Sequence, residues 1–503
     1  MNKLKVKSKY LILGLLMVVF GSYSAMANNI QVSNVVLHGQ NTIQNYSMIK
    51  FDLGWDNSWK VFSGPSNWDA AWVFVKYRRK AENIWHHAKL SYVDGTNDGH
   101  IISAGGKIEL INDNPNSTGT SYANGVFVSR VFSTNSPITV NYNVELKWNY
   151  FLNNLTDQDS VEIRVFAIEM VYVNQGAFYV GSGGEEENAF YKNPFRYNPY
   201  KILSESAITL GGSGAGLSYD GQALTATTLP AEYPKGYDAF YCMKYEITYK
   251  QYAEFFNTFD LIILTTGFNS TFNGYVDYYV SDRFTPFNVN WDRASAYLDW
   301  AALRPMTELE YEKACRGPNY PLKNEYVWGT NFVRGLPYTY SGTEYDSNTV
   351  ITNNYANTYS AGNCSYAIYD YSSSTYVGEL VRVGIFSDNV LNTGRITSGA
   401  TYYGIMEMAG NLAELVISVN TSAAQVYNPI NGDGELDANN KANQSTWPLP
   451  VPLDSRTIIA RGGSYNEGKG RLRTSDRYYF DLSSSGYSPN TSSYTIRGVR
   501  LAP

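Results

Sequence analysis

The sequence predicts two folded parts in series: an all-β sandwich over residues 28–166 and a loop-rich α+β domain over residues 167–503. Three observations support this prediction. A chain of 503 residues is longer than one hydrophobic core usually serves. Short alternating apolar runs separated by turn residues fill the first part, without a helical period. Helix start signals followed by long irregular stretches fill the second part.

The first 27 residues have the features of a secretory signal peptide. Lysines occupy every second position from Lys3 to Lys9, an apolar run covers Leu11–Phe20, and Ala25-Met26-Ala27 has the small residues of a cleavage site. Such a run is too short to cross a bilayer, which takes about twenty residues, and no later segment is apolar enough. Because no cysteine follows the run, we expect no lipid anchor. We expect an exported protein (periplasmic, cell-surface or secreted) whose mature chain begins near Asn28.

Five runs within residues 28–166 alternate apolar and polar side chains as strands do. They are Ile30–Val36, Ser47–Leu53, Ala71–Tyr77, Gly125–Phe132 and Ser160–Phe166. Clusters of Asn, Gly, Ser and Pro separate them, which indicates turns. Short strands with frequent turns predict an antiparallel sandwich of immunoglobulin-like type.

Three helices are predicted within residues 167–503. Two of them begin with a capping box, a threonine followed three residues later by Gln or Glu: Thr248 with Gln251, and Thr307 with Glu310. Gly317 is the stop signal of the second capped helix. Apolar residues at helical spacing predict a further helix over Trp291–Ala301. Beyond Gly317 we expect few regular elements, and such a long irregular backbone needs cross-ties.

The composition excludes one class of partner. Charged residues make up 17% of the chain, the formal net charge is −6, and no long run of Lys or Arg occurs. Because nucleic-acid binding depends on the neutralisation of phosphates, we expect no nucleic-acid partner. The three cysteines, Cys242, Cys315 and Cys364, allow at most one disulfide. Cys242 lies in a strand-like run and Cys315 in a capped helix, so we expect both to be free core residues.

Four blocks of the sequence carry a family likeness. In chain order they are Phe240–Thr248, Arg304–Gly317, Tyr403–Glu414, and the Arg461–Ser464 turn with the Arg497–Arg500 end. In these blocks the chain resembles the formylglycine-generating enzyme (sulfatase-modifying factor) family. The resemblance implies a variant of the C-type lectin fold, with a small twisted sheet, two main helices and much loop. Met170–Gly181 likewise resembles the first hairpin of that family.

The resemblance also implies a calcium site in the third block. Its expected ligands are the side chains of Glu407 and Glu414 and the backbone carbonyls of Gly410 and Leu412. An all-oxygen set with two carboxylates suits a hard cation. The alternative is that both glutamates are simply solvated. A second calcium site of the family would fall near Asn357 and Thr358, but the acidic partner near Thr375 is missing, so we do not expect it.

Copper chemistry is not expected. In catalytic members of the family, two cysteines just after the Gly-Gly-Ser-aromatic turn bind copper and oxidise a sulfatase cysteine. The corresponding run here, Asn466–Leu472, contains no cysteine, and Cu(I) needs soft thiolate ligands. All four histidines lie in the first part, so the second part has no imidazole base. We expect His86 and His87 to be a polar surface pair rather than metal ligands.

The loop between Arg477 and Arg497 is rich in Tyr, Ser, Asn and Gly, the residues of adaptable binding loops. With the nearby Gly-Gly-Ser turn it gives the predicted binding residues Asn466, Glu467, Arg473, Tyr478, Tyr479, Tyr487 and Tyr494. The alternative is a solvated loop without a ligand. Four arginines are expected to tie loops down through buried bidentate contacts: Arg461, Arg473, Arg477 and Arg500.

Together these observations predict an exported, non-catalytic binding or structural protein. Its partner would be an unidentified protein or glycan, or it would belong to a surface or secretion assembly. One alternative is a sulfatase-maturing oxidoreductase that forms formylglycine with other residues, such as Cys315 or Cys364. Another is a variable ligand-binding receptor made by a diversity-generating retroelement. A nearby reverse-transcriptase gene and adenine-rich codons in the loop would indicate that origin.

Overall fold

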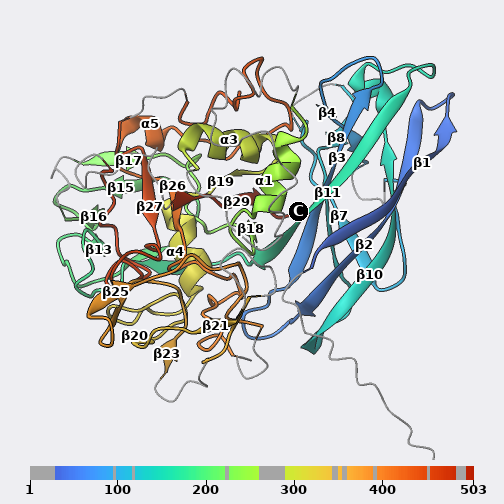
Figure 1. Cartoon of the computed structure of the whole chain (residues 1–503). Coiled ribbons are helices and arrows are strands. Elements are labelled where there is room, and N and C mark those ends of the chain that lie inside the picture. Colours follow the sequence, from blue (N-terminus) through green and yellow to red (C-terminus); the bar gives the residue numbers. More distant parts are fainter. Residues whose placement is uncertain are drawn as a thin grey trace, which may run out of the picture.

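Figure 1 shows the computed structural model of the chain, in which two sheets and a pair of helices form three layers. The structure describes residues 29–93, 98–115, 119–220, 226–259, 289–341, 349–353, 360–388, 394–449, 454–482 and 494–503. The expected signal peptide lies outside these residues. We name the outer sheet sheet A and the middle sheet sheet B.

Sheet A contains six strands in the order β1-β2-β10-β5-β8, with β6 paired to β10. Their bounds are β1 (Gln31–Asn41), β2 (Tyr46–Lys60), β10 (Thr134–Trp148), β5 (Leu90–Ser91), β8 (Tyr122–Ala123) and β6 (Ile101–Ile102). The long strands β2 and β10 are antiparallel, and Phe51 lies opposite Val144. Both side chains are fully buried and belong to the core between the two sheets.

Sheet B contains eight strands in the order β19-β29-β18-β11-β3-β9-β7, with β4 paired to β3. Their bounds are β19 (Arg304–Pro305), β29 (Gly498–Leu501), β18 (Phe240–Met243), β11 (Val161–Val173), β3 (Asp69–Arg79), β9 (Val126–Arg130), β7 (Gly106–Glu109) and β4 (His86–His87). β3 is buried on both faces, since Val73 packs in the core shared with sheet A and Trp72 in the core shared with the helices.

Strand β11 joins the two parts of the chain. It pairs with β3 along Val161–Val171 and with β18 along Met170–Val173. The boundary expected between residues 166 and 167 lies within this strand, so both parts of the chain share sheet B. Phe166 of β11 packs edge-on against Trp300, with ring centroids 4.9 Å apart. The hydrophobic core is therefore continuous across the expected boundary.

The described helices are few and short. They are α1 (Tyr249–Phe256), α3 (Trp291–Trp300), α4 (Glu308–Arg316), α5 (Ser422–Gln425) and the 3-10 helix η1 (Tyr150–Asn153). Both predicted capping boxes are confirmed, because Thr248 Oγ1 accepts a hydrogen bond from Gln251 N, and Thr307 Oγ1 accepts one from Glu310 N. The helix predicted over Trp291–Ala301 is confirmed as α3. Among the described residues, no helix has the length and apolar character needed to cross a membrane.

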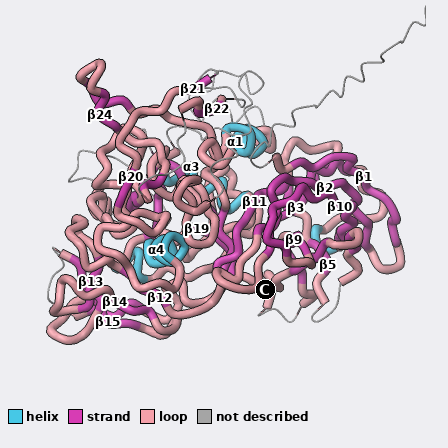
Figure 2. The backbone as a smooth tube through the Cα atoms, turned by 90° about the horizontal axis from the view of Figure 1, so that it is seen from below, coloured by secondary structure: helices cyan, strands magenta, loops and turns pink. Residues whose placement is uncertain are grey.

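Small sheets and long loops make up the rest of the second part (Figure 2). The two-stranded sheets are β12 (Phe178–Val180) with β14 (Tyr200–Ile202), β20 (Phe332–Val333) with β23 (Ala361–Gly362), β21 (Tyr340–Ser341) with β22 (Val350–Ile351), and β24 (Ile368–Asp370) with β25 (Thr375–Val377). A four-stranded sheet has the order β13 (Phe190–Lys192), β16 (Leu217–Tyr219), β15 (Ile208–Leu210), β17 (Thr227–Leu229), and a three-stranded sheet the order β27 (Ile458–Arg461), β26 (Ala413–Ile417), β28 (Tyr494–Thr495). The hairpin expected over Met170–Gly181 is wrong, because β11 pairs with β3 and β18 while β12 pairs with β14.

His87 lies at the contact between the sandwich and a loop of the second part. Only 2% of the residue is exposed, so the prediction of a polar surface position is wrong for His87. Its backbone N donates to Glu435 Oε1 at 2.6 Å, and a Cβ on Gly434 would lie 2.0 Å from its Nδ1. Burial, reinforced by the nearby Lys76 ammonium, holds the pKa of His87 well below its ordinary value. The ring therefore stays neutral in the folded protein.

Acid should weaken this contact. Below pH 6.5 the unfolded chain takes up a proton at His87 that the folded chain resists, so stability falls as pH falls. Between pH 6.5 and 5 we expect wild type to lose up to about 2 kcal/mol relative to His87→Phe, which cannot take up that proton. Urea unfolding of both proteins at the two pH values measures this difference. An equal gap between them at both pH values would contradict the prediction.

Candidate functional site

The three-stranded sheet β27-β26-β28 brings the third and fourth sequence blocks together. Glu414 of β26 lies opposite Arg461 of β27, and Gly410 N donates to Gly462 O at 3.0 Å. Gly462 has a φ of 85°, and a Cβ there would lie 2.7 Å from Met408 O. The close approach and the positive φ both require glycine at this turn. The third sequence block (Tyr403–Glu414, called the Gly-Asn block below) and the Gly-Gly-Ser turn (Gly462–Ser464) are thus one packed unit.

Glu407 and Glu414, two of the expected calcium ligands, are buried in this unit. Glu407 Oε1 accepts a hydrogen bond from Gly384 N at 2.9 Å, and Glu414 Oε1 accepts one from Arg497 Nε at 3.0 Å. The second oxygen of each carboxylate is buried and has no hydrogen-bond partner among the described residues. Burial raises the pKa of both carboxyl groups to about 7, although the Arg497 guanidinium opposes the shift.

A third buried carboxylate, Glu246, belongs to the same cluster. Its Oε1 accepts a hydrogen bond from Leu412 N at 2.9 Å, and its Oε2 accepts one from Asn411 Nδ2 at 2.5 Å. Burial raises the pKa of Glu246 well above its ordinary value, while Arg497 opposes the shift and the other two glutamates add to it. The sequence interpretation missed this residue. Glu246 lies in the first sequence block, directly before the apolar residue Ile247, and this position could have identified it as a candidate site residue.

The carboxylate oxygens of this cluster do not all have hydrogen-bond partners among the described residues. The cluster holds three glutamates and one arginine, and two of its carboxylate oxygens have no partner within the described chain. In the part of the chain that the structure describes, no group of three or more His, Cys, Asp or Glu side chains could hold a metal ion. The expected set has only two side-chain ligands; Gly410 and Leu412 would add backbone carbonyls. Of the second calcium location, Asn357 and Thr358 lie outside the described residues.

Buried arginines tie the loops of the second part to helix α4. Arg477 donates to both oxygens of Glu308, from Nε at 2.6 Å and from Nη2 at 3.0 Å. Arg461 donates to Glu308 at 3.2 Å and to Glu312 at 2.8 Å. All four side chains are fully buried. The prediction that these two arginines make buried tying contacts is confirmed.

The other two arginines differ from each other. Arg500 is fully buried and donates to Asp113 Oδ1 of the sandwich and to the carbonyl of Ala302, so the prediction is confirmed there too. Arg473 is only partly buried, and its Nη1 donates to Asn324 Oδ1 at 3.3 Å. It has no carboxylate partner among the described residues, so the predicted bidentate contact is wrong for Arg473.

The Gly-Gly-Ser turn places two predicted binding residues near the surface. Asn466 is exposed and Glu467 partly buried, and Glu467 Oε2 accepts a hydrogen bond from Ser464 N at 2.8 Å. Burial raises the pKa of Glu467 to about 7. The backbone carbonyl of Glu467 accepts a hydrogen bond from Ala367 N at 2.9 Å. This bond fixes the turn against the chain that leads into the β24–β25 hairpin.

The four tyrosines that the sequence predicted as binding residues do not form one common surface. Tyr478 is partly buried beneath Arg471, whose guanidinium carbon lies 3.3 Å from the ring centroid. Tyr479 and Tyr494 are 5% and 2% exposed and belong to the hydrophobic core, so their rings stabilise the fold instead of facing a ligand. Tyr487 lies outside the described residues.

Three tyrosines that the sequence interpretation missed lie on the β24–β25 hairpin, at the edge of the molecule in Figure 2. Tyr371 is 85% exposed, Tyr376 70% and Tyr369 36%. The Tyr369 ring meets the other two rings edge-on at centroid distances of 5.0 and 5.2 Å. Residues 369–376 have the same Tyr and Ser composition that drew attention to the loop after Arg477, so the signal was available.

Comparison with known proteins gives the family. Residues 162–488 match the family model described as the sulfatase-modifying factor enzyme 1-like domain. The chain belongs to this family. The matched range begins inside β11 and includes both the Gly-Asn block and the Gly-Gly-Ser turn. No curated protein matches the chain.

The sulfatase-modifying factor domain contains all three cysteines of the chain, and each is free and buried. Burial raises the pKa of the Cys242 thiol to about 12 and raises those of Cys315 and Cys364 as well. The thiolate is the form that attacks and binds metals, and burial disfavours this form in all three thiols. The prediction that Cys242 and Cys315 are free core residues is confirmed.

Proposed function

We propose that the chain is an exported, non-catalytic binding or structural protein built on a sulfatase-modifying factor domain. The observation that supports this most strongly is the state of its thiols. All three are buried with raised pKa values, and none lies in the run Asn466–Leu472. A buried neutral thiol neither holds Cu(I) nor donates electrons to oxygen as a thiolate does.

The surface beside the Gly-Gly-Ser turn supports a binding role. Asn466 and the three hairpin tyrosines offer polar groups and aromatic area on elements linked by the Ala367–Glu467 hydrogen bond. Tyrosine supplies large contact area at a low cost in conformational entropy. We propose a protein or glycan as the partner. We also propose that the sandwich is of the immunoglobulin-like class and that the second part is of the C-type lectin-like class.

A copper(I) titration tests the proposal. The purified chain should remove Cu(I) from a chromophoric chelator no better than a protein without exposed thiols does. A tight one-to-one copper site that disappears in Cys364→Ala or Cys315→Ala would contradict it. The same titration on a catalytic member of the family is the positive control.

We also propose that calcium stabilises the domain. The support is the pair of buried, unpartnered carboxylate oxygens on Glu407 and Glu414, which a divalent cation would satisfy together with backbone carbonyls. The Arg497 guanidinium balances only part of the charge of the three buried glutamates.

Calcium should therefore raise the unfolding temperature of the chain. At a free calcium concentration 100 times the dissociation constant, the gain is about 2.7 kcal/mol. Glu407→Gln keeps the oxygen that accepts from Gly384 N but removes the charge, so it should lose most of this gain. Thermal unfolding in calcium and in EDTA measures both proteins, with Asp454→Asn, an exposed site, as the control. Equal unfolding temperatures in calcium and EDTA would contradict the calcium proposal.

A further inference from the structure

A cavity of about 370 Å³ lies at the C-terminal end of α4, and no residue of the Gly-Gly-Ser turn lines it. Its floor contains the buried side chains of Arg316 and Glu325 and the partly buried Arg395. Its mouth contains Asn319, Tyr320 and Leu322, and the last two are 66% and 53% exposed. The volume is at the small end of the range for ligand pockets, which starts at about 300 Å³.

Two of the three charged groups of this cavity neutralise each other. Arg316 Nε donates to Glu325 Oε1, and Arg316 Nη1 donates to Glu312 Oε2 at 2.9 Å. The second oxygen of Glu325 accepts a hydrogen bond from Leu322 N at 3.1 Å. Glu325 is therefore committed to Arg316 and to the backbone.

Arg395 is the charge that remains. Its Nη2 donates to two backbone carbonyls, Val327 O at 2.6 Å and Cys315 O at 3.2 Å, and it has no carboxylate within ion-pair distance among the described residues. Its Nε is buried without a hydrogen-bond partner there. A Cβ on Gly329, which lines the cavity, would lie 2.7 Å from Nη1, so this nitrogen lies at the cavity wall. Burial lowers the pKa of Arg395 to about 10, which still leaves it charged at neutral pH.

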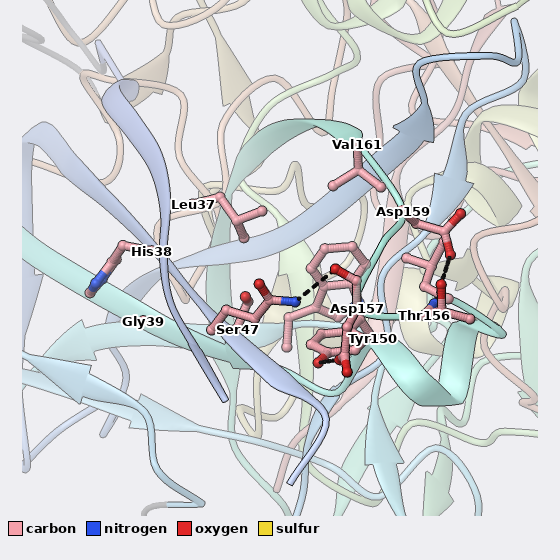
Figure 3. Close-up of a pocket in the computed structure, with 12 residues that line it drawn as sticks. Leu37, His38, Gly39, Ser47, Tyr150, Thr156, Asp157, Asp159 and Val161 are labelled. Carbon is pink, nitrogen blue, oxygen red and sulfur yellow. Dashed lines mark hydrogen bonds between the residues drawn. The ribbon is translucent and has the colours of Figure 1, made fainter. Parts of the chain in front are cut away.

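A second cavity, at the end of the sandwich, lacks such a group (Figure 3). It has a volume of about 240 Å³ and contains Asp157 and Asp159. Tyr150 OH donates to Asp157 Oδ1 at 2.5 Å, and Thr156 N donates to Asp159 Oδ2 at 2.7 Å. Its carboxylates are thus already hydrogen-bonded, whereas the cavity beside α4 holds a guanidinium that has no hydrogen-bonded carboxylate among the described residues.

We propose that the cavity beside α4 binds a small organic carboxylate, with Arg395 as its counter-ion. A carboxylate oxygen would accept a hydrogen bond from Arg395 Nη1 at the cavity wall, and the guanidinium would balance its negative charge. The Asn319 amide adds a further hydrogen-bond donor at the mouth. The exposed faces of Tyr320 and Leu322 favour an apolar or aromatic body attached to the carboxylate. This site is separate from the proposed calcium cluster, so its test is independent of that proposal.

Calorimetric titration of the full mature chain with benzoate tests the assignment, with benzamide as the neutral isostere and sulfate as an inorganic anion. Benzoate should bind one to one and at least tenfold more tightly than either. Arg395→Gln should weaken benzoate binding at least tenfold. Because that change also removes bonds to Val327 O and Cys315 O, Asn319→Asp provides a second variant that places a negative charge at the mouth and leaves these bonds intact.

Asn319→Asp should also weaken benzoate binding at least tenfold. Arg456→Gln, which changes an exposed arginine paired with Asp454, should bind benzoate as wild type does. Benzamide or sulfate binding as tightly as benzoate would overturn the proposal. An unchanged benzoate affinity in Asn319→Asp would overturn it as well.

Discussion

Glu308→Gln should destabilise the folded chain by about 3–5 kcal/mol, because it leaves two buried guanidinium groups short of a carboxylate. Glu308 accepts hydrogen bonds from Arg477 and Arg461, and its Oε1 also accepts one from Val419 N at 2.9 Å. Glutamine keeps one acceptor but presents an amide group to the arginines at the other position. The midpoint of urea unfolding measures the loss.

The control for Glu308 is an ion pair of the same chemistry on the surface. Arg456 and Asp454 are paired at 2.7 Å with side chains that are 49% and 40% exposed. Asp454→Asn should change stability by about 1 kcal/mol or less, since exposed pairs contribute little. Equal effects of the two substitutions would show that the buried network does not tie the loops to α4.

Trp72→Ala should cost about 3–5 kcal/mol, as large-to-small changes of buried tryptophans do. Trp72 of β3 is 1% exposed, and its Nε1 donates to the backbone carbonyl of Ala301, just after α3, at 2.8 Å. Arg500 lies over the ring at 4.3 Å from the centroid. The substitution therefore loosens the sandwich from the sulfatase-modifying factor domain as well as opening a cavity.

Two further variants serve as controls for Trp72→Ala. Trp72→Phe keeps an aromatic ring and loses the hydrogen bond to Ala301 O, so it should cost clearly less than Trp72→Ala. Phe62→Ala removes a side chain that is 63% exposed and should change stability by about 0.5 kcal/mol or less. Because both parts of the chain share sheet B, Trp72→Ala should lower the midpoint of a single unfolding transition. Tryptophan fluorescence and circular dichroism should both report this one transition. A variant in which only the sandwich unfolds early would contradict a shared core.

Local patterns predicted the elements with strong signals. The capping threonines fixed the starts of α1 and α4, and alternation within Ser47–Leu53 found β2. Strand β10 was missed, although Val140, Tyr142, Val144 and Leu146 alternate with exposed or half-exposed residues. The shared sheet could not be predicted from local patterns. The pairing of β11 with both β3 and β18 joins segments far apart in the sequence, and periodicity carries no information about such partners.

The candidate site was predicted in part. The blocks located Glu407 and Glu414, and the structure adds Glu246 and Arg497 as their buried neighbours. Composition alone did not separate exposed from buried tyrosines. Tyr479 and Tyr494 fill the core, whereas Tyr371 and Tyr376 of a hairpin with similar composition are exposed. Burial depends on tertiary packing, which a run of Tyr and Ser does not encode.

Aldehyde formation on a peptide that carries the cysteine motif of a sulfatase tests the central claim most directly. That claim is that the domain keeps the family scaffold without its oxidation chemistry. The chain would be incubated with the peptide, copper, oxygen and a reductant, beside a catalytic family member as positive control, and the products measured by mass spectrometry. We predict no aldehyde above the level without protein. Aldehyde that increases with the concentration of the chain and disappears in Cys315→Ala or Cys364→Ala would contradict the claim.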